Sequence, residues 1–463
     1  MSGQAEALVA YDATNRTGHI AGVRRAQRTA KLAIVDLDGA FSFTLFSGSL
    51  FIVLLGSYGA LLFLCAFLGF AMLRPAAVAR TIKKHWFFLL FPAYAFLSTI
   101  WSDETPHTLK HSLEYIITVV AGLLIATSRN QRSTMMGLFA AFAFYTIASL
   151  AMGTVVEVGQ TGVSALSGLN DSKNQQADTV ANGGLISLLI FANGLRSRRI
   201  FQCLLAGGIG LVQLYATIAA ESAGALAGLA FALAVFCTLA MLRNATRSMR
   251  TAVMSTAGAI AAAGAIFILT FTDDMLRWLS VAFDKDVTLT GRTYLWTRAH
   301  ELIFERPVAG RGFGAFWQQG NFDAEGIWRF AHIVNRGGFN FHNVAYDILV
   351  DLGWAGLVLF FATLAFGFWA AASGYVRRPT LFGCYWVALG AFLLVRMPIE
   401  TIGIYEFYFS TVLLYAVFAS SSADMRLIRS KRRPALQRLG PEASVARGAL
   451  RSAAQAEARW RAP

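Results

Sequence analysis

Apolar residues in this chain come in blocks long enough to cross a lipid bilayer, and short charged segments separate the blocks. A membrane-spanning helix needs about 20 predominantly apolar residues. The pattern therefore predicts an all-α integral membrane protein with about 12 transmembrane helices and one long loop that carries short helices. The clear blocks lie near 86–101, 109–127, 135–152, 179–195, 200–218, 223–242, 251–271, 353–373, 380–396 and 405–421.

The block at 41–73 is too long for one comfortable span and short for two. Gly56–Gly59, in its middle, has the composition of a turn, so we interpret the block as a hairpin of two short helices. The basic residues support this count. Both basic termini and every short basic loop then face the cytoplasm, as the positive-inside rule requires, whereas one span fewer would leave a basic terminus outside.

This topology divides the chain into five parts. They are a cytoplasmic basic segment (1–40), transmembrane helices 1–9 (41–271), a periplasmic loop expected to be catalytic (272–341), a periplasmic helix with transmembrane helices 10–12 (342–421), and a cytoplasmic basic tail (422–463). Residues 1–40 have no apolar signal-peptide core, so we expect them to stay with the mature protein. We expect multiple membrane passes with both termini in the cytoplasm.

Composition agrees with a membrane protein. Hydrophobic residues make up 56% of the chain and charged residues 14%, and the mean hydropathy is +0.53; soluble domains carry about 25% charged residues. The net charge of +14 invites a nucleic-acid interpretation, but the excess lies in cytoplasmic loops and the tail, where it orients helices and meets anionic lipid. We therefore expect a lipid surface and no nucleic acid as partner. The cysteines lie inside apolar blocks without metal-ligand spacing, which predicts no disulfide framework.

The loop 272–341 is rich in arginine and has a net charge near zero. Arginine presents a planar fork of donors that suits phosphate, so the loop fits an anionic, phosphorylated lipid headgroup. A solvated loop with internal salt bridges is the alternative. The basic residues are Arg277, Lys285, Arg292, Arg298, Arg306, Arg311, Arg329 and Arg336.

Within this loop, residues 292–306 have the apolar spacing of an amphipathic helix. Thr290 is a candidate N-cap, Pro307 ends the helix, and Arg298 and Glu301 form an i,i+3 pair. The apolar positions are Leu295, Ala299, Leu302 and Ile303. The run Gly310–Gly314 follows, but it has no strand–turn–helix context, which excludes a dinucleotide fold.

The loop ends at His342, which would lie at a helix N-terminus near the membrane surface. A lone histidine there is usually structural. However, His342-Asn343 followed at a distance by Gly353–Gly356 resembles the His-Asn signature of O-antigen ligases, whose superfamily includes repeat-unit polymerases of exopolysaccharide synthesis. Thr290–Trp296, together with the downstream glycine run, resembles the Gly-Arg block of the same superfamily.

Further segments are similar to the polymerase branch of that superfamily. They are Ser98–Pro106, Ser172-Lys173-Asn174 and Glu400 before the last span. The chain departs from the superfamily at one place. Many members begin a middle span with a Ser-Arg-Gly-Ala-like segment, whereas this chain has Glu221–Ala225, without arginine.

The resemblance implies a metal-independent, inverting transfer of glycan from undecaprenyl pyrophosphate to an acceptor sugar hydroxyl at the periplasmic face, with no cofactor and no metal. It implies catalytic roles for His342, as general base, and Arg292, on the leaving pyrophosphate. Histidine suits a base because its unperturbed pKa is near 6.5. Implied substrate-binding residues are Arg311, Lys173, Asn174, Asn343 and Glu400, and implied motif glycines are Gly291, Gly310, Gly312, Gly314, Gly353 and Gly356.

The implied partners are the lipid-linked oligosaccharide, an acceptor glycan or glycolipid, membrane lipid and polysaccharide export proteins. Trp101–Pro106 and Lys173-Asn174 favour a polymerase, and an O-antigen ligase acting on lipid A-core is the alternative.

Asp347 and Asp351, one turn apart, are expected to contact the bundle.

Two functions of other classes compete with an enzyme: a multi-span transporter and a non-catalytic export scaffold. The spans hold few charges and show no repeat, which disfavours a transporter.

The predicted topology can be tested by labelling. Single cysteines at Ser2, Gln318 and Ser452 should react with a membrane-impermeant thiol reagent on intact cells only at Gln318, because the other two positions are expected in the cytoplasm. Permeabilised cells, in which all three should label, are the control. Labelling of Ser2 on intact cells would refute the twelve-span count.

Overall fold

The computed structural model describes residues 37–158, 163–170, 172–270, 292–333, 336 and 339–422. Six helices in the described part of the chain are long and apolar enough to cross a membrane, or seven if one bent pair is counted as a span. They are α6 (Thr105–Ala126), α7 (Gln131–Met152), α8 (Lys173–Arg196), α9 (Ile200–Ala219), α10 (Ala223–Leu242) and α15 (Val344–Arg377). The prediction of a helical membrane protein is confirmed, while the full span count stays a prediction.

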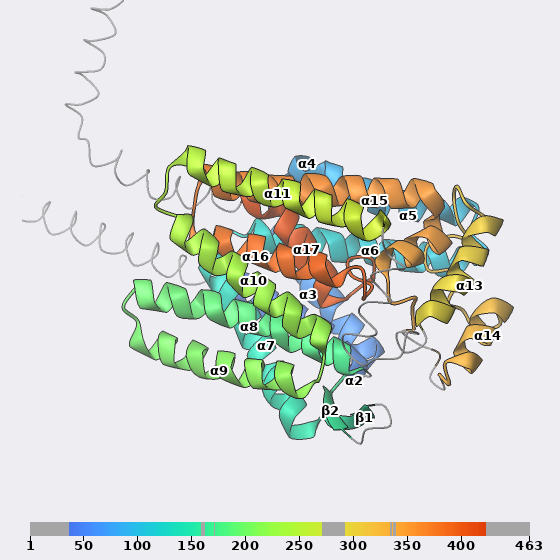
Figure 1. Cartoon of the computed structure of the whole chain (residues 1–463), viewed down its shortest axis with the longest axis horizontal. Coiled ribbons are helices and arrows are strands. Elements are labelled where there is room, and N and C mark those ends of the chain that lie inside the picture. The colour runs from blue at the N-terminus through green and yellow to red at the C-terminus, as the bar shows by residue number, and fades with distance from the viewer. Residues whose placement is uncertain are drawn as a thin grey trace, which may run out of the picture.

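Three further apolar helices join the same bundle (Figure 1). They are α11 (Arg247–Thr270), α16 (Leu381–Arg396) and α17 (Phe409–Ala419). Two short helices, α13 (Arg292–Glu305) and α14 (Phe322–Phe330), lie beyond one end of the bundle, at the right of Figure 1. They come from the loop in which the sequence predicted short helices.

The chain folds back on itself at Gly56, inside the stretch that the sequence suggested as a turn. A helix over residues 37–50 and α2 (Ile52–Leu55) precede Gly56, which has a φ of 54°, and α3 (Ser57–Leu73) follows it. Gly48 and Gly59 face each other so closely that a Cβ added to Gly48 would lie 2.8 Å from the Gly59 carbonyl oxygen. The two arms of the hairpin therefore pack backbone to backbone.

The segment after α3 turns sharply. The bent pair Ser57–Leu73 and Pro75–Ile100 meets at an angle of 100°. The predicted block 86–101 is not one regular helix, because the chain passes through two 3₁₀ segments on either side of a short α-helix. In order, the elements are α4 (Pro75–His85), η1 (Trp86–Leu89), α5 (Leu90–Leu97) and η2 (Ser98–Ile100).

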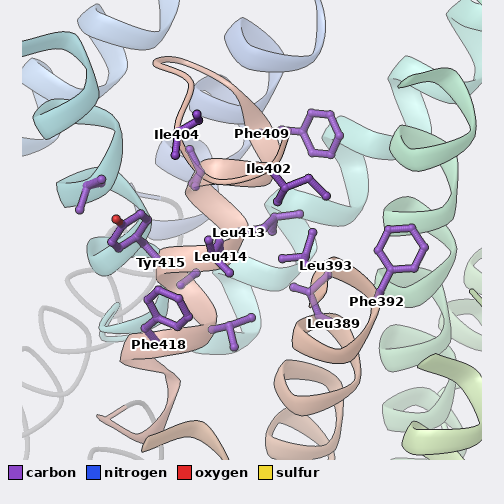
Figure 2. Close-up of a cluster of buried hydrophobic side chains, with 14 of the residues drawn as sticks. Leu389, Phe392, Leu393, Ile402, Ile404, Phe409, Leu413, Leu414, Tyr415 and Phe418 are labelled. Carbon is purple, nitrogen blue, oxygen red and sulfur yellow. The ribbon is translucent and has the colours of Figure 1, made fainter. Parts of the chain in front are cut away.

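Apolar side chains of α16, of α17 and of the loop between them form one cluster of the hydrophobic core (Figure 2). The labelled residues are Leu389, Phe392, Leu393, Ile402, Ile404, Phe409, Leu413, Leu414, Tyr415 and Phe418. On the α6 side the packing is close, because a Cβ on Gly122 would lie 2.5 Å from the Val412 carbonyl oxygen. Tyr115 and Tyr415 link the same two helices through their hydroxyls, 2.9 Å apart. This core fixes the base of the loop that carries Glu400.

The sequence did not predict a small antiparallel sheet before α8. Its strands are β1 (Thr154–Val158), which is rich in β-branched residues, and β2 (Val163–Gly168), which has only Val163. All-α is therefore correct for the bundle but omits this hairpin. The hairpin leads directly into α8, whose N-cap Ser172 accepts a hydrogen bond from the Asn174 backbone.

The amphipathic helix predicted in the loop is confirmed as α13. Its predicted apolar residues, Leu295, Ala299, Leu302 and Ile303, are all buried. Arg298 pairs with Glu301, as predicted, and also with Asp323 of α14 at 3.0 Å. Thr290, the predicted N-cap, lies outside the described residues.

The segment that follows α13 is fastened to α15. Helix α15 has a break at Gly353, which has a φ of 62°, and a Cβ there would overlap the Val308 carbonyl group. Trp354 N donates to Pro307 O at 2.8 Å, and Arg311 N donates to Val350 O at 3.1 Å. The break therefore separates a short leading helix, 344–352, from the span, and the chain after α13 lies against that break.

Candidate functional site

A cavity of about 700 Å³ opens between α8, the residues before α15, and the loop joining α16 to α17. Segments far apart in the sequence thus supply its walls. Its polar lining includes Gln175, Asp178, Asn182, Asn340, His342 and Glu400. Two of these six, His342 and Glu400, are predicted site residues.

His342 occupies a constrained position at the start of α15. Its φ is 51°, in the left-handed region that side chains other than glycine seldom adopt. Its backbone N–H donates to Asn340 Oδ1 at 2.8 Å. The next residue, Asn343, caps α15 by accepting from Ala345 N at 2.9 Å, and its amide donates to Pro398 O at 3.1 Å. Asn343 therefore positions His342 instead of lining the cavity itself.

Glu400 is the centre of the charged groups around the cavity. It is 8% exposed. One carboxylate oxygen, Oε1, lies 3.3 Å from Arg292 Nη2 and 3.5 Å from Arg396 Nη2, and the other, Oε2, lies 3.6 Å from His342 Nδ1. The structure therefore brings together Arg292, His342 and Glu400, which the sequence proposed separately.

These neighbours decide the charge of Glu400. Burial alone would raise the pKa of its carboxyl group, but His342, Arg396 and Arg292 together lower that pKa below its usual value. Glu400 is thus an ionised carboxylate at neutral pH. Burial also lowers the pKa of the Arg292 guanidinium, against the opposing effect of Glu400, although an arginine side chain stays charged in proteins.

Behind Glu400 lies a buried ion pair that the sequence pattern did not predict. Arg396 is 1% exposed and makes two hydrogen bonds to Asp178 of α8, from Nε at 2.7 Å and from Nη2 at 3.1 Å. The third guanidinium nitrogen, Nη1, lies against Gly224, where an added Cβ would overlap it. Gly224 belongs to the Glu221–Ala225 segment that lacks the superfamily's arginine. Arg396 thus brings a guanidinium, from another helix, to the start of α10.

Lys173 and Asn174 connect α8 to that same segment. Lys173 Nζ donates to the Glu221 carbonyl oxygen at 3.1 Å, and Asn174 Oδ1 accepts from the Ser222 hydroxyl at 2.8 Å. Asp178, one turn further along α8, faces the cavity. The predicted pair therefore holds two helix ends together beside the cavity.

Arg311, the second candidate for phosphate binding, does not reach Glu400. Its guanidinium pairs with Glu305 and, at 3.4 Å, with Asp103 in the turn before α6. Arg306 pairs with the other oxygen of Asp103 at 2.6 Å. This part of the loop thus has the internal salt bridges that were the alternative to a phosphate site.

The motif glycines allow segments of backbone to approach each other closely. Gly310, Gly312 and Gly314 all have positive φ, and a Cβ on Gly310 would overlap the Asp351 carbonyl group. Asp351 also accepts from the Gly314 backbone N–H at 2.8 Å through its side chain. Gly356 is buried inside α15, and Gly291 lies outside the described residues. The described glycines therefore fit the loop to α15.

Asp347 and Asp351 were expected to contact the bundle, but their carboxylates accept hydrogen bonds from loop residues. Asp347 accepts from the Phe341 backbone N–H at 3.2 Å and pairs with the Thr401 hydroxyl. The Asp351 carboxylate accepts from the Gly314 backbone N–H. Both carboxylates thus hold loop segments against the start of α15.

One sequence signal could have indicated the pair of Asp178 and Arg396, namely charged residues at apolar segments. Asp178 and Arg396 lie at or within predicted spans, where an ionisable residue is a functional-site candidate by default. Their partnership crosses 218 positions of sequence, which no local periodicity reveals.

Comparison with known proteins agrees with this geometry. The family model described as O-antigen ligase matches residues 208–361. That range contains Arg292 and His342 but not Asp178, Arg396 or Glu400. The exopolysaccharide production protein ExoQ of Rhizobium meliloti (strain 1021) is 29% identical over 343 residues, which are 71% of this chain and 75% of that protein.

The fold and the site thus define a helical membrane protein related to glycosyl transfer. Both matches support the resemblance to the superfamily of O-antigen ligases and exopolysaccharide polymerases. The resemblance inferred from the sequence motifs is confirmed.

The buried pair should dominate stability. Asp178→Ala should destabilise the folded protein by about 3–5 kcal/mol, because it leaves the Arg396 charge buried without its bidentate partner. Glu301→Ala, which breaks a more exposed pair with Arg298, should cost less than about 1 kcal/mol. Unfolding midpoints of the purified proteins in detergent measure both. Equal midpoints for the two variants would contradict a structural role for the buried pair.

Proposed function

We propose that the protein transfers an undecaprenyl-pyrophosphate-linked glycan to an acceptor sugar hydroxyl at the periplasmic face of the bacterial inner membrane, as a polysaccharide repeat-unit polymerase. The observation that carries the proposal is the convergence of His342 and two arginines on Glu400 at the wall of one cavity. In the proposed topology about 12 spans place both termini in the cytoplasm and the 272–341 loop in the periplasm.

His342 acts as the general base. Glu400 faces Nδ1 of the imidazole at 3.6 Å, which favours the tautomer whose Nε2 is free to accept a proton. The acceptor hydroxyl gives its proton to Nε2 as its oxygen attacks the anomeric carbon. The ionised Glu400 then stabilises the imidazolium that forms.

The arginines act on the leaving group. As the new glycosidic bond forms, the bond between the anomeric carbon and the pyrophosphate oxygen breaks, and negative charge grows on the phosphate. Fixed cations aimed at that charge lower the barrier. Arg292 is already held 3.3 Å from Glu400 Oε1, so a phosphate that binds beside Glu400 competes with this carboxylate for its guanidinium. Arg396, buried against Asp178 and 3.5 Å from the same oxygen, adds positive charge behind Glu400.

A single displacement of this kind inverts the anomeric configuration, since the hydroxyl attacks opposite the leaving pyrophosphate. The scheme needs a base and fixed cations and assigns no step to a metal ion or a cofactor. The substrates are the lipid-linked oligosaccharide and an acceptor glycan or glycolipid. Polysaccharide export proteins are the proposed protein partners.

Polymerase and ligase differ only in the acceptor. The relative with a match over 71% of this chain is an exopolysaccharide production protein, which supports polymerisation. The family description supports the alternative, an O-antigen ligase that would accept lipid A-core. Purified protein that receives only lipid-linked repeat units should make long products if it is a polymerase, and it should require lipid A-core if it is a ligase. A transporter, the competing class, would make no glycosidic bond under either condition.

Arg292 should be required for turnover. Arg292→Ala should abolish polymer formation, and Arg292→Lys should restore little, because an ammonium group lacks the fork of donors that binds phosphate at two points. Arg336→Ala is the control, since Arg336 pairs with Glu325 at 3.0 Å, away from Glu400. Normal polymer from properly inserted Arg292→Ala would show that the pyrophosphate assignment is wrong.

His342 should control the pH dependence. The base must be neutral, so wild-type turnover should rise with pH across the range in which histidine loses its proton. His342→Gln should lose about 10²–10⁴-fold in rate while still binding the lipid-linked donor, because glutamine forms hydrogen bonds but does not accept the proton. Rates of the purified proteins in nanodiscs across pH provide the test. An identical pH profile for both proteins, or a loss below about tenfold, would remove His342 from the base role.

A further inference from the structure

The N-terminal part of α6 carries a set of metal-ligating side chains that the proposed reaction does not use. His107, His111 and Glu114 are spaced i, i+4 and i+7, so they lie on one face of the helix. They lie outside the long loop and precede it by more than one hundred residues. Two histidines one turn apart on a helix are a recurrent way to hold zinc.

A fourth side chain reaches this face from the other end of the chain. Glu406 lies in the loop 397–408, between α16 and α17, and its Oε1 is 2.6 Å from His111 Nδ1. The ligand atoms of His111, Glu114 and Glu406 all lie within 4.8 Å of one another. The His107 ring stacks on that of His111, with centroids 4.1 Å apart. Donors from two distant segments thus converge on one point.

The point where these side chains meet opens to a cavity and has two carboxylates. His107, His111 and Glu406 line a second cavity, of about 500 Å³, so a ligand could complete the coordination from that side. The Glu114 carboxylate makes no hydrogen bond or ion pair with any of the described residues. Both glutamates are half-buried. Lys110, on the same helical turn, is exposed.

We propose that His111, Glu114 and Glu406 bind a zinc-class divalent cation, with His107 as the nearest further ligand. Zinc accepts imidazole nitrogen and carboxylate oxygen at about 2.0–2.2 Å, so ligand atoms on opposite sides of the ion lie up to about 4.4 Å apart. Small side-chain movements bring the observed atoms to that spacing. Mg²⁺ and Ca²⁺ prefer all-oxygen sites, and the imidazole therefore selects against them.

The bound cation would fasten the 397–408 loop to α6. That loop also carries Glu400, and Phe339, Tyr405 and Glu406 line both cavities. A metal ion at Glu406 therefore positions the wall shared by the two cavities, without entering the proposed transfer step. Metal binding would replace the 2.6 Å contact between His111 Nδ1 and Glu406 Oε1 with bonds from both atoms to the ion.

Metal titration of the purified full-length protein, without a histidine tag and after chelator treatment, tests the proposal. Isothermal titration with ZnCl₂ should show one saturable site per chain, weaker binding of MnCl₂, and none of MgCl₂ or CaCl₂ at the same concentrations. Zinc should also raise the unfolding midpoint, since it binds only the folded state strongly. Neither readout depends on the proposed transferase activity.

Variants separate the ligands from their surroundings. His111→Ala should weaken zinc binding more than about 100-fold, beyond the effect of losing an outer-shell partner. Glu114→Gln should weaken it too, and this variant keeps the contact between His111 and Glu406 that holds the loop. Lys110→Ala is the matched control on the same turn. It should bind zinc at least as tightly as wild type, because it removes a nearby positive charge.

Two results would overturn the proposal. One is the absence of saturable zinc binding to the wild-type protein. The other is unchanged affinity in Glu114→Gln, which would place the ion elsewhere. In either case the approach of His111 to Glu406 is a hydrogen-bonded contact alone, and the proposed transfer reaction is unaffected.

Discussion

A charge placed inside an apolar helix bundle must meet an opposite charge there, and the ion pair of Asp178 and Arg396 meets this constraint. The pair joins α8 to α16, and the guanidinium fits only because Gly224 of α10 has no side chain. Three helices are therefore held in register by one interaction. Since Arg396 also reaches Glu400, the position of the cavity wall depends on the same contact.

The site is assembled from segments that share no local structure. Arg292 comes from a surface helix, His342 from a helix cap, Glu400 from a loop and Asp178 from a membrane helix. Backbone packing at glycines and helix caps hold several of these segments, and buried partners fix the long side chains of Arg292 and Arg396. Such a site keeps its charges close together at a low cost in side-chain entropy.

The sequence predicted those parts of the fold and site that have a local pattern. Apolar periodicity located α13, and a short motif selected His342, which the structure places beside Arg292 and Glu400. The sequence did not predict the direction of the Arg311 side chain, because its partner Asp103 lies 208 positions away. The pair of Asp178 and Arg396 and the β1–β2 hairpin were missed for a related reason. Their stability comes from contacts between segments, or from strands too short to show a period.

The break in α15 at Gly353 separates the site residues into two groups. The Trp296 indole of α13 donates to Phe341 O at 3.0 Å, next to His342, so Arg292 and His342 lie on the same side of the break. Glu400 belongs to the bundle, on the other side of the break. Two hydrogen bonds join the two parts, from the Asn343 amide to the Pro398 carbonyl oxygen and from the Thr401 hydroxyl to Asp347. Rotation about Gly353 would thus withdraw the base and a cation together from Glu400, which couples admission of a bulky lipid-linked substrate to loss of the catalytic arrangement.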